Sequence, residues 1–342
     1  MKKILYLYFG SASPVTKFEK NVIDQINNEY TNYSIEFWDW TSEIGLKFNP
    51  SLKWTYRHLN FMADFHKKVI DKSKDFDYVF IAQTGGVIPE VMDKITSRII
   101  YNTADDPESS NTCSFPFLEH ADFIVHAGVS YDKNRKIGQV FKELGAKNTY
   151  FMPIGFYEEM YPAISNFDQQ FKNRIIPLVF VGAPKIGKLE HIIRYFKNNV
   201  HIYCRKNSAK LSKIYYYIAT NKKINEYEGK LTDLYGIAQV GINVHYSFGP
   251  SNVRSYQLCA NGVAQVIDCE EGINDIYEPE KEVLSYKKQS EAIIQIERLL
   301  LDDDLRYFIS LNGYNKARNT YSRKQLLVNM FDNLISKLLV MR

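Results

Sequence analysis

SFGPSNVRSYQLCANGVAQVID, residues 247–268, predicts most about the fold, because a loop, a short helix and a buried strand follow one another in it. The helix opens near Asn252, and the strand runs from Val263 to Ile267. Arg254 lies in the first turn of this helix, where unpaired backbone N–H groups and the helix dipole favour an anion. An arginine there can bind a diphosphate through parallel charge-assisted hydrogen bonds, or it can pair with a neighbouring side chain. The first alternative predicts a phosphate-bearing ligand at the mouth of a parallel sheet.

Short and almost wholly apolar strands alternate with helices along the chain. This alternation predicts an α/β protein with parallel sheets covered by helices on both faces. One long amphipathic helix is expected from Leu52 to Ser73. The expected strands are Lys3–Phe9, Ser34–Trp38, Tyr78–Gln83, Arg98–Asn102, Phe123–Ala127, Thr149–Pro153, Ile176–Gly182, His201–Arg205, Gly241–His245 and Val263–Asp268.

The strand pattern restarts after a polar joint, which predicts two doubly wound domains. We expect a first Rossmann-like domain over residues 1–160, a linker over 161–174 and a second Rossmann-like domain over 175–320. Residues 321–342 carry apolar side chains at helical spacing and predict a helix that returns towards the first domain. Ligands are expected at the carboxyl ends of the strands.

The composition is that of a soluble globular protein, with 45% hydrophobic and 24% charged residues among 342. A net charge of +4 is too weak to predict nucleic-acid binding. Residues 185–230 nevertheless hold eleven Lys or Arg against three Asp or Glu. This basic stretch can attract an anionic substrate or a membrane surface, or it can simply be a solvated lysine-rich face.

Four cysteines lack any paired spacing, and the short apolar run at the N-terminus has no cleavage site after it. No stretch approaches the about 18–20 apolar residues that span a bilayer. These features predict a cytoplasmic protein, with peripheral association at the inner face of the membrane left open.

Two acidic runs, Asp105-Asp106 and Asp302-Asp303-Asp304, could suggest a metal site. Asp302, Asp303 and Asp304 stand at a helix start, where acidic side chains favour the dipole, so capping accounts for them. No His and Cys cluster accompanies either run. We therefore expect neither a metal ion nor a cofactor.

Several segments, in this order and spacing, resemble one family. The chain resembles the glycosyltransferases of the GT-B fold and, more narrowly, the bacterial spore-maturation CgeB-like glycosyltransferases. The segments that carry the resemblance are YNTADDP at 101–107, FMPIGF at 151–156, FVG at 180–182, DLYGIAQVGINVH at 233–245, NVRSYQLCANGVAQVID at 252–268 and EAIIQIERLLLDDDLRYFISLNGYNKA at 291–317.

The resemblance implies two Rossmann-like domains that face a cleft, the first binding an acceptor and the second a nucleotide-sugar donor. The implied activity is transfer of a sugar to a glycan or a protein, with surface polysaccharide synthesis as the expected setting. In this group a glutamate usually stands three residues after the arginine and binds the ribose of the donor. Gln257 holds that position here and can still accept through its carbonyl, although without a negative charge.

The expected donor site lies in the second domain. Arg254, with Asn252 and Ser255, is the candidate for the diphosphate. Tyr235 is either a donor contact or a simple packing tyrosine. The remaining candidates are Gly182, Lys185 and Lys188 in the loop after the first strand of this domain, Arg205 just past the next strand, Tyr227 and Glu228 for the base, and Gln257 for the ribose.

The first domain is expected to seat the acceptor and to supply a general base. Asp106 is the first candidate for the base, with Asp39, Asp105 and His58 behind it, although Asp105-Asp106-Pro107 also suits a capping or turn motif. The expected acceptor contacts are Ser11, Ser13, Thr84, Gly85, Gly86 and Asp105.

The expected stereochemistry of the sugar transfer follows from the absence of a pair of glutamates. Retaining members of the wider fold carry two glutamates eight positions apart, where this chain has Gly249 and Gln257. The leading interpretation is an inverting, metal-independent glycosyltransferase. A catalytically silent sugar-nucleotide or glycan-binding protein, and an epimerase on the same scaffold, are the alternatives.

Overall fold

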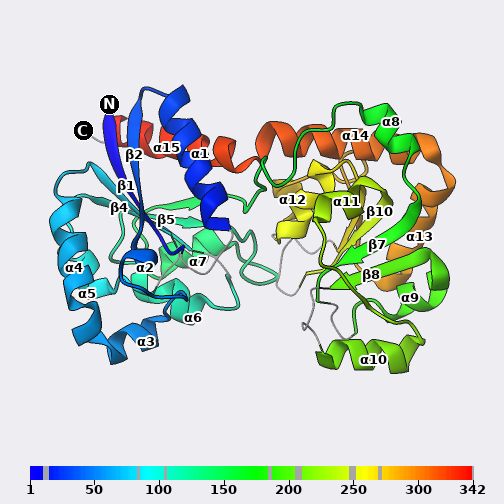
Figure 1. The fold of residues 1–342 in the computed structure, drawn as a ribbon, viewed down its shortest axis with the longest axis horizontal. Coiled ribbons are helices and arrows are strands. Elements are labelled where there is room, and N and C mark those ends of the chain that lie inside the picture. Colours follow the sequence, from blue (N-terminus) through cyan, green and yellow to red (C-terminus); the bar gives the residue numbers. More distant parts are fainter. Residues whose placement is uncertain are drawn as a thin grey trace. The chain divides into compact units, whose positions relative to one another are not determined.

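The computed structural model describes residues 1–10, 15–82, 85–103, 106–183, 187–204, 210–245, 252–268 and 272–340. It divides into two compact units, Met1–Pro153 with Arg323–Arg342, and Ile154–Ser322 (Figure 1). Each unit contains one six-stranded sheet whose strands all pair in parallel. None of the described helices is long and apolar enough to cross a membrane.

The first unit is a doubly wound sheet of strand order β2-β1-β3-β4-β5-β6. Its strands are β1 Lys2–Tyr8, β2 Tyr33–Asp39, β3 Tyr78–Ala82, β4 Arg98–Asn102, β5 Phe123–His126 and β6 Thr149–Phe151. Its helices are α1 Val15–Glu29, α2 Trp40–Glu43, α3 Leu52–Arg57, α4 Leu59–Ser73, α5 Pro89–Met92, α6 Ser110–Cys113, α7 Ile137–Glu143 and α15 Arg323–Val340, with a 3-10 turn η1 at Phe115–Phe117.

The second unit repeats this plan with strand order β12-β11-β10-β7-β8-β9. Its strands are β7 Ile176–Val181, β8 Val200–Cys204, β9 Asn225–Glu226, β10 Ala238–Asn243, β11 Ala264–Asp268 and β12 Leu284–Tyr286. Its helices are α8 Phe167–Lys172, α9 Glu190–Phe196, α10 Lys210–Thr220, α11 Leu231–Gly236, α12 Val253–Ala260, α13 Gln289–Leu301 and α14 Asp303–Thr320, with 3-10 turns η2 Lys197–Asn199 and η3 Ile273–Asp275.

Burial on both faces explains why the central strands read as apolar runs. Every residue of β3 and of β11 is buried, because helices cover both sides of each sheet. Residues of each sheet contribute to a buried apolar cluster of their own unit. The predicted fold class is therefore confirmed.

The expected helix from Leu52 to Ser73 is in fact two helices, and the break has a local cause. His58 ends α3, with its backbone N–H donating to the Thr55 carbonyl at 3.0 Å. Its ring stacks on Trp54, with 4.1 Å between ring centroids, and Nδ1 lies 2.8 Å from the Trp54 carbonyl oxygen. These contacts hold His58 in a non-helical conformation before α4 starts.

The expected linker, residues 161–174, lies within the second unit and contains α8. Arg174 anchors its end, because the buried guanidinium donates to the carbonyl oxygens of Tyr235 at 2.8 Å and Asn261 at 2.7 Å. Burial lowers the pKa of Arg174 to about 10. This segment is thus part of the packed second unit.

A buried ion pair attaches α15 to the first unit. Arg323, at the start of α15, donates from Nη2 to the Glu19 carboxylate of α1 at 2.8 Å and from Nε at 3.0 Å. Glu19 is completely buried and also accepts from the Tyr6 hydroxyl of β1. The helix that closes the described chain is therefore fixed to α1 and to the first strand.

We predict that Arg323→Met lowers the free energy of unfolding of the first unit by about 3–5 kcal/mol, because it leaves the Glu19 carboxylate buried and uncompensated. All three tryptophans, Trp38, Trp40 and Trp54, lie in this unit, so tryptophan fluorescence during urea unfolding reports on it selectively.

The matched control is Lys324→Met, which removes the neighbouring ion pair with Glu29. Because that pair is more exposed, its loss should change stability by about 0–1 kcal/mol. Equal effects of the two substitutions would contradict the role given to Arg323.

Candidate functional site

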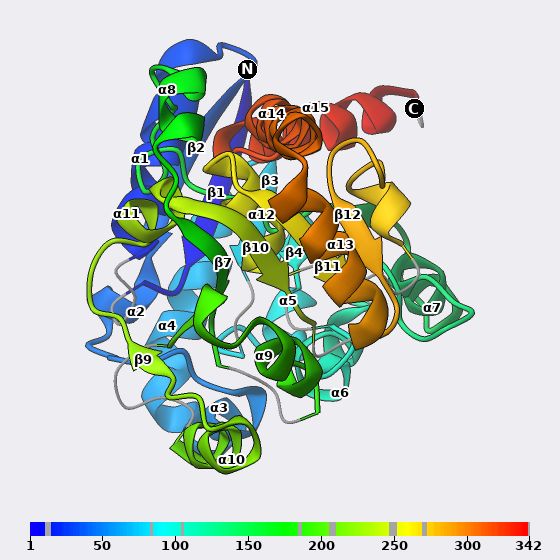
Figure 2. The same cartoon turned by 90° about the vertical axis from the view of Figure 1, so that its right-hand side faces the viewer.

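The carboxyl edge of the second sheet gathers the polar residues singled out in the sequence. Strands β7, β10 and β11 end there, at Val181, Asn243 and Asp268. Helix α12 opens at the same edge (Figure 2). Open parallel sheets bind their ligands outside the carboxyl ends of such strands, so this edge is the candidate site.

Asn252 begins α12 as the sequence predicts. Its Oδ1 accepts from the Ser255 backbone N–H at 3.0 Å, which is the usual N-cap contact. Its Nδ2 donates to Oδ1 of Asn243 at 2.9 Å. The cap therefore also fixes the start of the helix to the end of β10.

Arg254 ties together the ends of two strands. Its Nε donates to the Val181 carbonyl oxygen at 2.6 Å, and its Nη1 donates to Asn243 Oδ1 at 2.9 Å and to the Val244 carbonyl oxygen at 3.3 Å. The guanidinium also lies over the Phe180 ring, 4.4 Å from its centroid. Carbonyl and amide oxygens are neutral, so these bonds fix the guanidinium without cancelling its charge.

Gly182 leaves room for this arginine. A Cβ at this position would lie 2.1 Å from Nη2 of Arg254, and the backbone has φ of +144°. Both facts demand glycine at the end of β7. The loop that follows includes Lys185, which lies outside the described residues, as do Arg205, Ser11, Ser13, Thr84 and Asp105.

A buried amide network underlies the site. Asn243 donates from Nδ2 to Ser255 Oγ at 3.0 Å and to Gln265 Oε1 at 3.1 Å. Gln265 in turn donates to the Ser255 carbonyl oxygen at 3.2 Å. All three side chains are completely buried. Satisfied buried polar groups of this kind hold β10, β11 and α12 in a single arrangement.

The sequence analysis missed His245 and Asp268. The His245 backbone N–H donates to Asp268 at 2.8 Å, the two side chains meet with 2.5 Å between Nδ1 and Oδ1, and Nε2 lies 3.2 Å from Ser255 Oγ. Ser255 is completely buried, so this Asp-His-Ser series is a structural network and not an accessible nucleophile. His245 follows β10 and Asp268 ends β11, so the parallel pairing of these two strands brings the two residues together.

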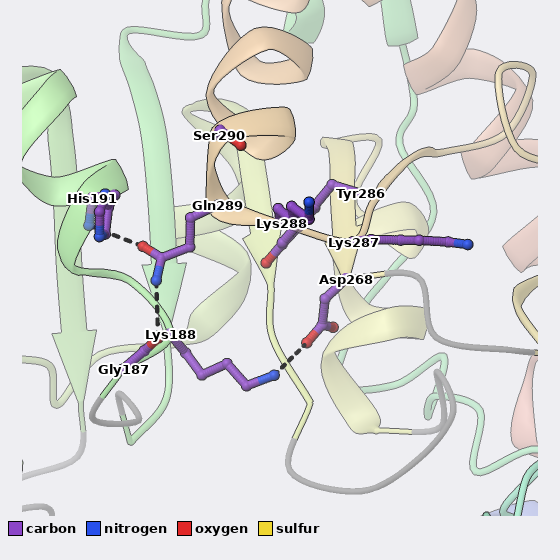
Figure 3. A pocket seen from close by; sticks show the side chains of 9 residues that line it. All are labelled: Gly187, Lys188, His191, Asp268, Tyr286, Lys287, Lys288, Gln289 and Ser290. Atoms are coloured by element: carbon purple, nitrogen blue, oxygen red, sulfur yellow. Dashed lines mark hydrogen bonds and ion pairs between the residues drawn. The ribbon is translucent and has the colours of Figure 1, made fainter. Parts of the chain in front are cut away.

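A pocket of about 500 Å³ opens at this edge (Figure 3). Lys188 extends over it, with 3.9 Å between its Nζ and Oδ2 of Asp268. Gln289 connects residues at the rim of the pocket. Its Nε2 donates to the Gly187 carbonyl oxygen at 2.9 Å, and its Oε1 accepts from the His191 backbone N–H at 2.9 Å. The lining residues are Gly187, Lys188, His191, Asp268, Tyr286, Lys287, Lys288, Gln289 and Ser290.

Charge in this pocket favours an anionic ligand. Three lysines, Lys188, Lys287 and Lys288, line the pocket together with a single acidic residue, Asp268. Sequence reasoning found Lys188 and missed the other two lysines. They follow β12, a three-residue strand too short to be recognised from its pattern.

Gln257 lies one turn after Arg254 on the same face of α12. Its side chain is half-buried, and its amide makes no hydrogen bond within the described part of the chain. The backbone carbonyl oxygen, in contrast, accepts from Asn261 at 2.7 Å. The side-chain amide therefore has both donor and acceptor capacity for a ligand.

The expected base-recognition residues make contacts within their own region. The Tyr227 hydroxyl donates to the Lys230 carbonyl oxygen, and its ring meets Tyr203 edge-on at 5.9 Å. Glu228 is exposed. Tyr235 is buried in α11, and burial raises its pKa to about 12. The packing interpretation is favoured for Tyr235.

In the first unit, the Asp106 carboxylate has three hydroxyl donors. Oδ2 accepts from Thr103 at 2.6 Å, and Oδ1 accepts from Ser110 at 2.5 Å and Ser114 at 2.6 Å. Asp106 is also buried. Because three hydroxyl groups already occupy this carboxylate, the geometry favours a role in holding residues 106–114.

Asp39 is engaged in a similar way. It caps α2 by accepting from the Ser42 N–H, and its Oδ1 also accepts from the Gly10 N–H at 3.0 Å. Gly10 has no space for a Cβ, which would lie 2.6 Å from Oδ2 of Asp39. This carboxylate therefore fixes the end of β1 and the start of α2.

The two glycines expected at the acceptor site have close backbone neighbours. A Cβ on Gly85 would lie 2.2 Å from the backbone nitrogen of Leu52. The Gly86 carbonyl oxygen lies 2.8 Å from Nε2 of the buried His66. Asp302 does cap α14, because its carboxylate accepts from the Leu305 N–H at 2.8 Å, so the capping interpretation is confirmed. Among the described residues no group of three His, Cys, Asp or Glu could hold a metal ion.

We predict that Gly182→Ala destabilises the protein mainly through the collision with Arg254. Overpacking of this kind costs about 1–3 kcal/mol. Urea unfolding followed by circular dichroism should therefore show that Gly182→Ala lowers the free energy of unfolding more in the wild-type background than in an Arg254→Ala background. The colliding group is absent from the second background.

Gly187→Ala is the matched control, since it has φ of +85° and no atom within 4 Å of its added Cβ. Because only backbone strain acts at this position, Gly187→Ala should lower the free energy of unfolding by the same amount in the wild-type and Arg254→Ala backgrounds. A Gly182→Ala effect that does not depend on Arg254 would contradict the proposed contact.

The comparisons with known proteins agree with this architecture. Residues 188–332 match the family model described as glycosyl transferase-like. No curated protein sequence matches the chain.

Solved structures match over nearly the whole chain. HepE from Anabaena, in complex with UDP-glucose, has a TM-score of 0.65 and 11% identity over 98% of this chain and 100% of its own. Sucrose-phosphate synthase from Thermosynechococcus elongatus has a TM-score of 0.69 and 10% identity over 100% of both chains. A glycosyltransferase from Rickettsia africae has a TM-score of 0.64 and 11% identity over 97% of both chains.

At these identities the structural likeness establishes the fold, and the family model matches less than half of the chain. The chain therefore has a GT-B fold, and its residues 188–332 are similar to the glycosyl transferase-like family.

Proposed function

We propose that this chain transfers a sugar, of the hexosyl type, from a nucleotide-sugar donor to a hydroxyl group of a glycan or a protein. One observation carries the proposal: Arg254 is fixed at the ends of β7 and β10 by neutral oxygens, beside the amino end of α12. A positive charge held in place at this edge suits the diphosphate of an activated sugar.

The proposed donor lies along the carboxyl edge of the second sheet. Arg254 and Lys188 face its diphosphate, and the unused amide of Gln257 binds a ribose hydroxyl group. HepE binds UDP-glucose in its crystal structure, so UDP-glucose is the first donor to test here. Departure of the sugar leaves a nucleoside diphosphate, whose growing charge these cations stabilise.

We further propose direct displacement with inversion and without a metal ion. The retaining pair of glutamates is replaced by Gly249 and Gln257, and side-chain cations can supply the charge that the leaving group needs. Asp106 is the base that the sequence predicts, whereas its three hydroxyl donors favour a positioning role, and the two roles are tested below. A cytoplasmic protein of the CgeB-like group that builds surface polysaccharide is the setting that we propose.

One observation favours a second function. Gln257 replaces the glutamate of the CgeB-like group, and loss of that charge suits a sugar-nucleotide or glycan-binding protein without catalysis. Incubation of the purified chain with UDP-glucose distinguishes the two, because release of UDP supports the transferase and binding without release supports the silent protein.

We predict that Arg254→Ala abolishes the thermal shift caused by a bound nucleotide sugar. A donor at about a hundred times its dissociation constant adds about 2.7 kcal/mol to native stability. The shift is measured against each variant's own unliganded melting temperature, with UDP-, GDP-, TDP-, ADP- and CMP-linked sugars, so that lost stability of the variant does not enter.

Arg298→Ala is the control, because Arg298 is an exposed arginine of α13 that pairs with Glu280. Its donor-induced shift should equal that of the wild type. An undiminished shift in Arg254→Ala would remove this arginine from the donor site.

Asp106→Asn separates a base from a positioning residue. Loss of a general base lowers the rate by about 10²–10⁴-fold. We expect instead that UDP release from UDP-glucose stays within about tenfold of wild type while stability falls by about 1–3 kcal/mol, because three buried hydroxyl groups lose their anionic acceptor.

The control here is Asp132→Asn, at a half-buried carboxylate that pairs with Arg135. It should leave both stability and UDP release close to wild type. A stable but inactive Asp106→Asn variant would establish Asp106 as the base and reject the positioning role.

A further inference from the structure

Helix α10 carries an exposed apolar stripe that the donor site does not use. Leu211, Ile214, Tyr217 and Ile218 are 80%, 59%, 57% and 78% exposed. No other described helix exposes more than two large apolar side chains. Exposed apolar residues are ordinary when they are scattered singly, whereas a contiguous group on one element marks an interaction surface.

The spacing places these side chains together on the outer face. Leu211, Ile214 and Ile218 follow the three- and four-residue steps of one helical face. Tyr216 lies on the opposite face and is completely buried in the core of the second unit. Because this tyrosine anchors the helix, the stripe is held outward. Figures 1 and 2 show α10 at the margin of the second unit.

Lysines flank the stripe. Residues 210–223, which contain α10, hold four Lys and no Asp or Glu. Lys210, at the start of α10, and Lys223, three residues after its end, are exposed. Lys213 pairs with Glu226, with 2.8 Å between Nζ and Oε1. A partner surface that fits this helix is apolar where it meets the four exposed side chains and anionic where it meets the flanking lysines.

We propose that α10 docks onto the anionic phospholipid surface of a membrane. The four apolar side chains enter the boundary between headgroups and acyl chains, where a tyrosine ring with a polar hydroxyl is well suited. The neighbouring lysines lie over the lipid phosphates and can extend their long side chains toward them. The helix lies in the plane of the interface and does not cross the bilayer.

Charge argues against a second copy of this chain as the occupant. A symmetric dimer through α10 would bring two lysine-rich segments of the same sign together at one interface, which electrostatic repulsion opposes. A lipid surface supplies the opposite charge at the same place. The docking is independent of the proposed donor chemistry, since it uses none of the residues assigned to the donor.

Co-sedimentation of the full chain with vesicles tests this proposal. One set of vesicles contains phosphatidylcholine alone, and the other contains equal parts of phosphatidylcholine and phosphatidylglycerol. We expect binding to the anionic vesicles, weaker binding to the neutral ones, and a decrease with added salt. The double variant Leu211→Ser with Ile218→Ser should bind at least about tenfold more weakly, because two apolar side chains no longer enter the lipid.

The matched control changes the same kinds of residue elsewhere in the second unit. Ile294→Ser with Leu301→Ser alters side chains of α13 that are 57% and 85% exposed, and it should bind like the wild type. Unliganded melting temperatures and donor-induced thermal shifts should be the same in all three proteins, so failure of docking is separable from failure of donor binding.

Three results would overturn the proposal. The first is absence of binding to anionic vesicles by the wild type. The second is equal binding by the α10 double variant and the wild type. The third, in sedimentation without lipid, is a wild-type dimer that the α10 substitutions convert to monomer, since the stripe would then be covered by a second copy.

Discussion

The hydrogen bonds from Arg254 to the end of β7 and to Asn243 are the contacts on which the second unit's carboxyl edge depends. They connect two neighbouring strands to the first turn of α12 at distances of 2.6 and 2.9 Å. Gly182 is required because any side chain there would collide with the guanidinium. Asn243 uses its whole amide, accepting from Arg254 and Asn252 and donating into the buried network. These contacts connect the strand ends and the helix without any ligand.

Much of the fold could be predicted from the sequence, because a strand buried on both faces is an uninterrupted apolar run. The ten expected strands are present, with ends displaced by a few residues. The strands β9 and β12 were missed because two or three residues cannot show a period. The break at His58 was missed for another reason: apolar spacing continues across it, and only the contact of its ring with Trp54 reveals the interruption.

The candidate site could be predicted less completely, since its partners are distant in sequence. Asn252 and Arg254 were found because helix capping is a local signal. The contact between His245 and Asp268 depends on the pairing of β10 with β11, which no local pattern specifies. For Asp106 the partners are close in sequence, and the local pattern permits two interpretations. A carboxylate after a strand resembles a base, although hydroxyl groups at Thr103, Ser110 and Ser114, close to it in sequence, were available as its donors.

The same arginine can serve the fold and a ligand because the two tasks require different properties of it. Holding the strand ends uses its N–H groups as directional donors to neutral oxygens, whereas stabilising a diphosphate uses its net charge. A charge fixed in advance does not need to reorganise when a leaving group develops its own, and this gives such a site its catalytic value. Gln257 differs from Arg254, because no described residue forms a hydrogen bond with its side-chain amide. Variation at that position can therefore change which ligand is bound while leaving the edge of the sheet intact.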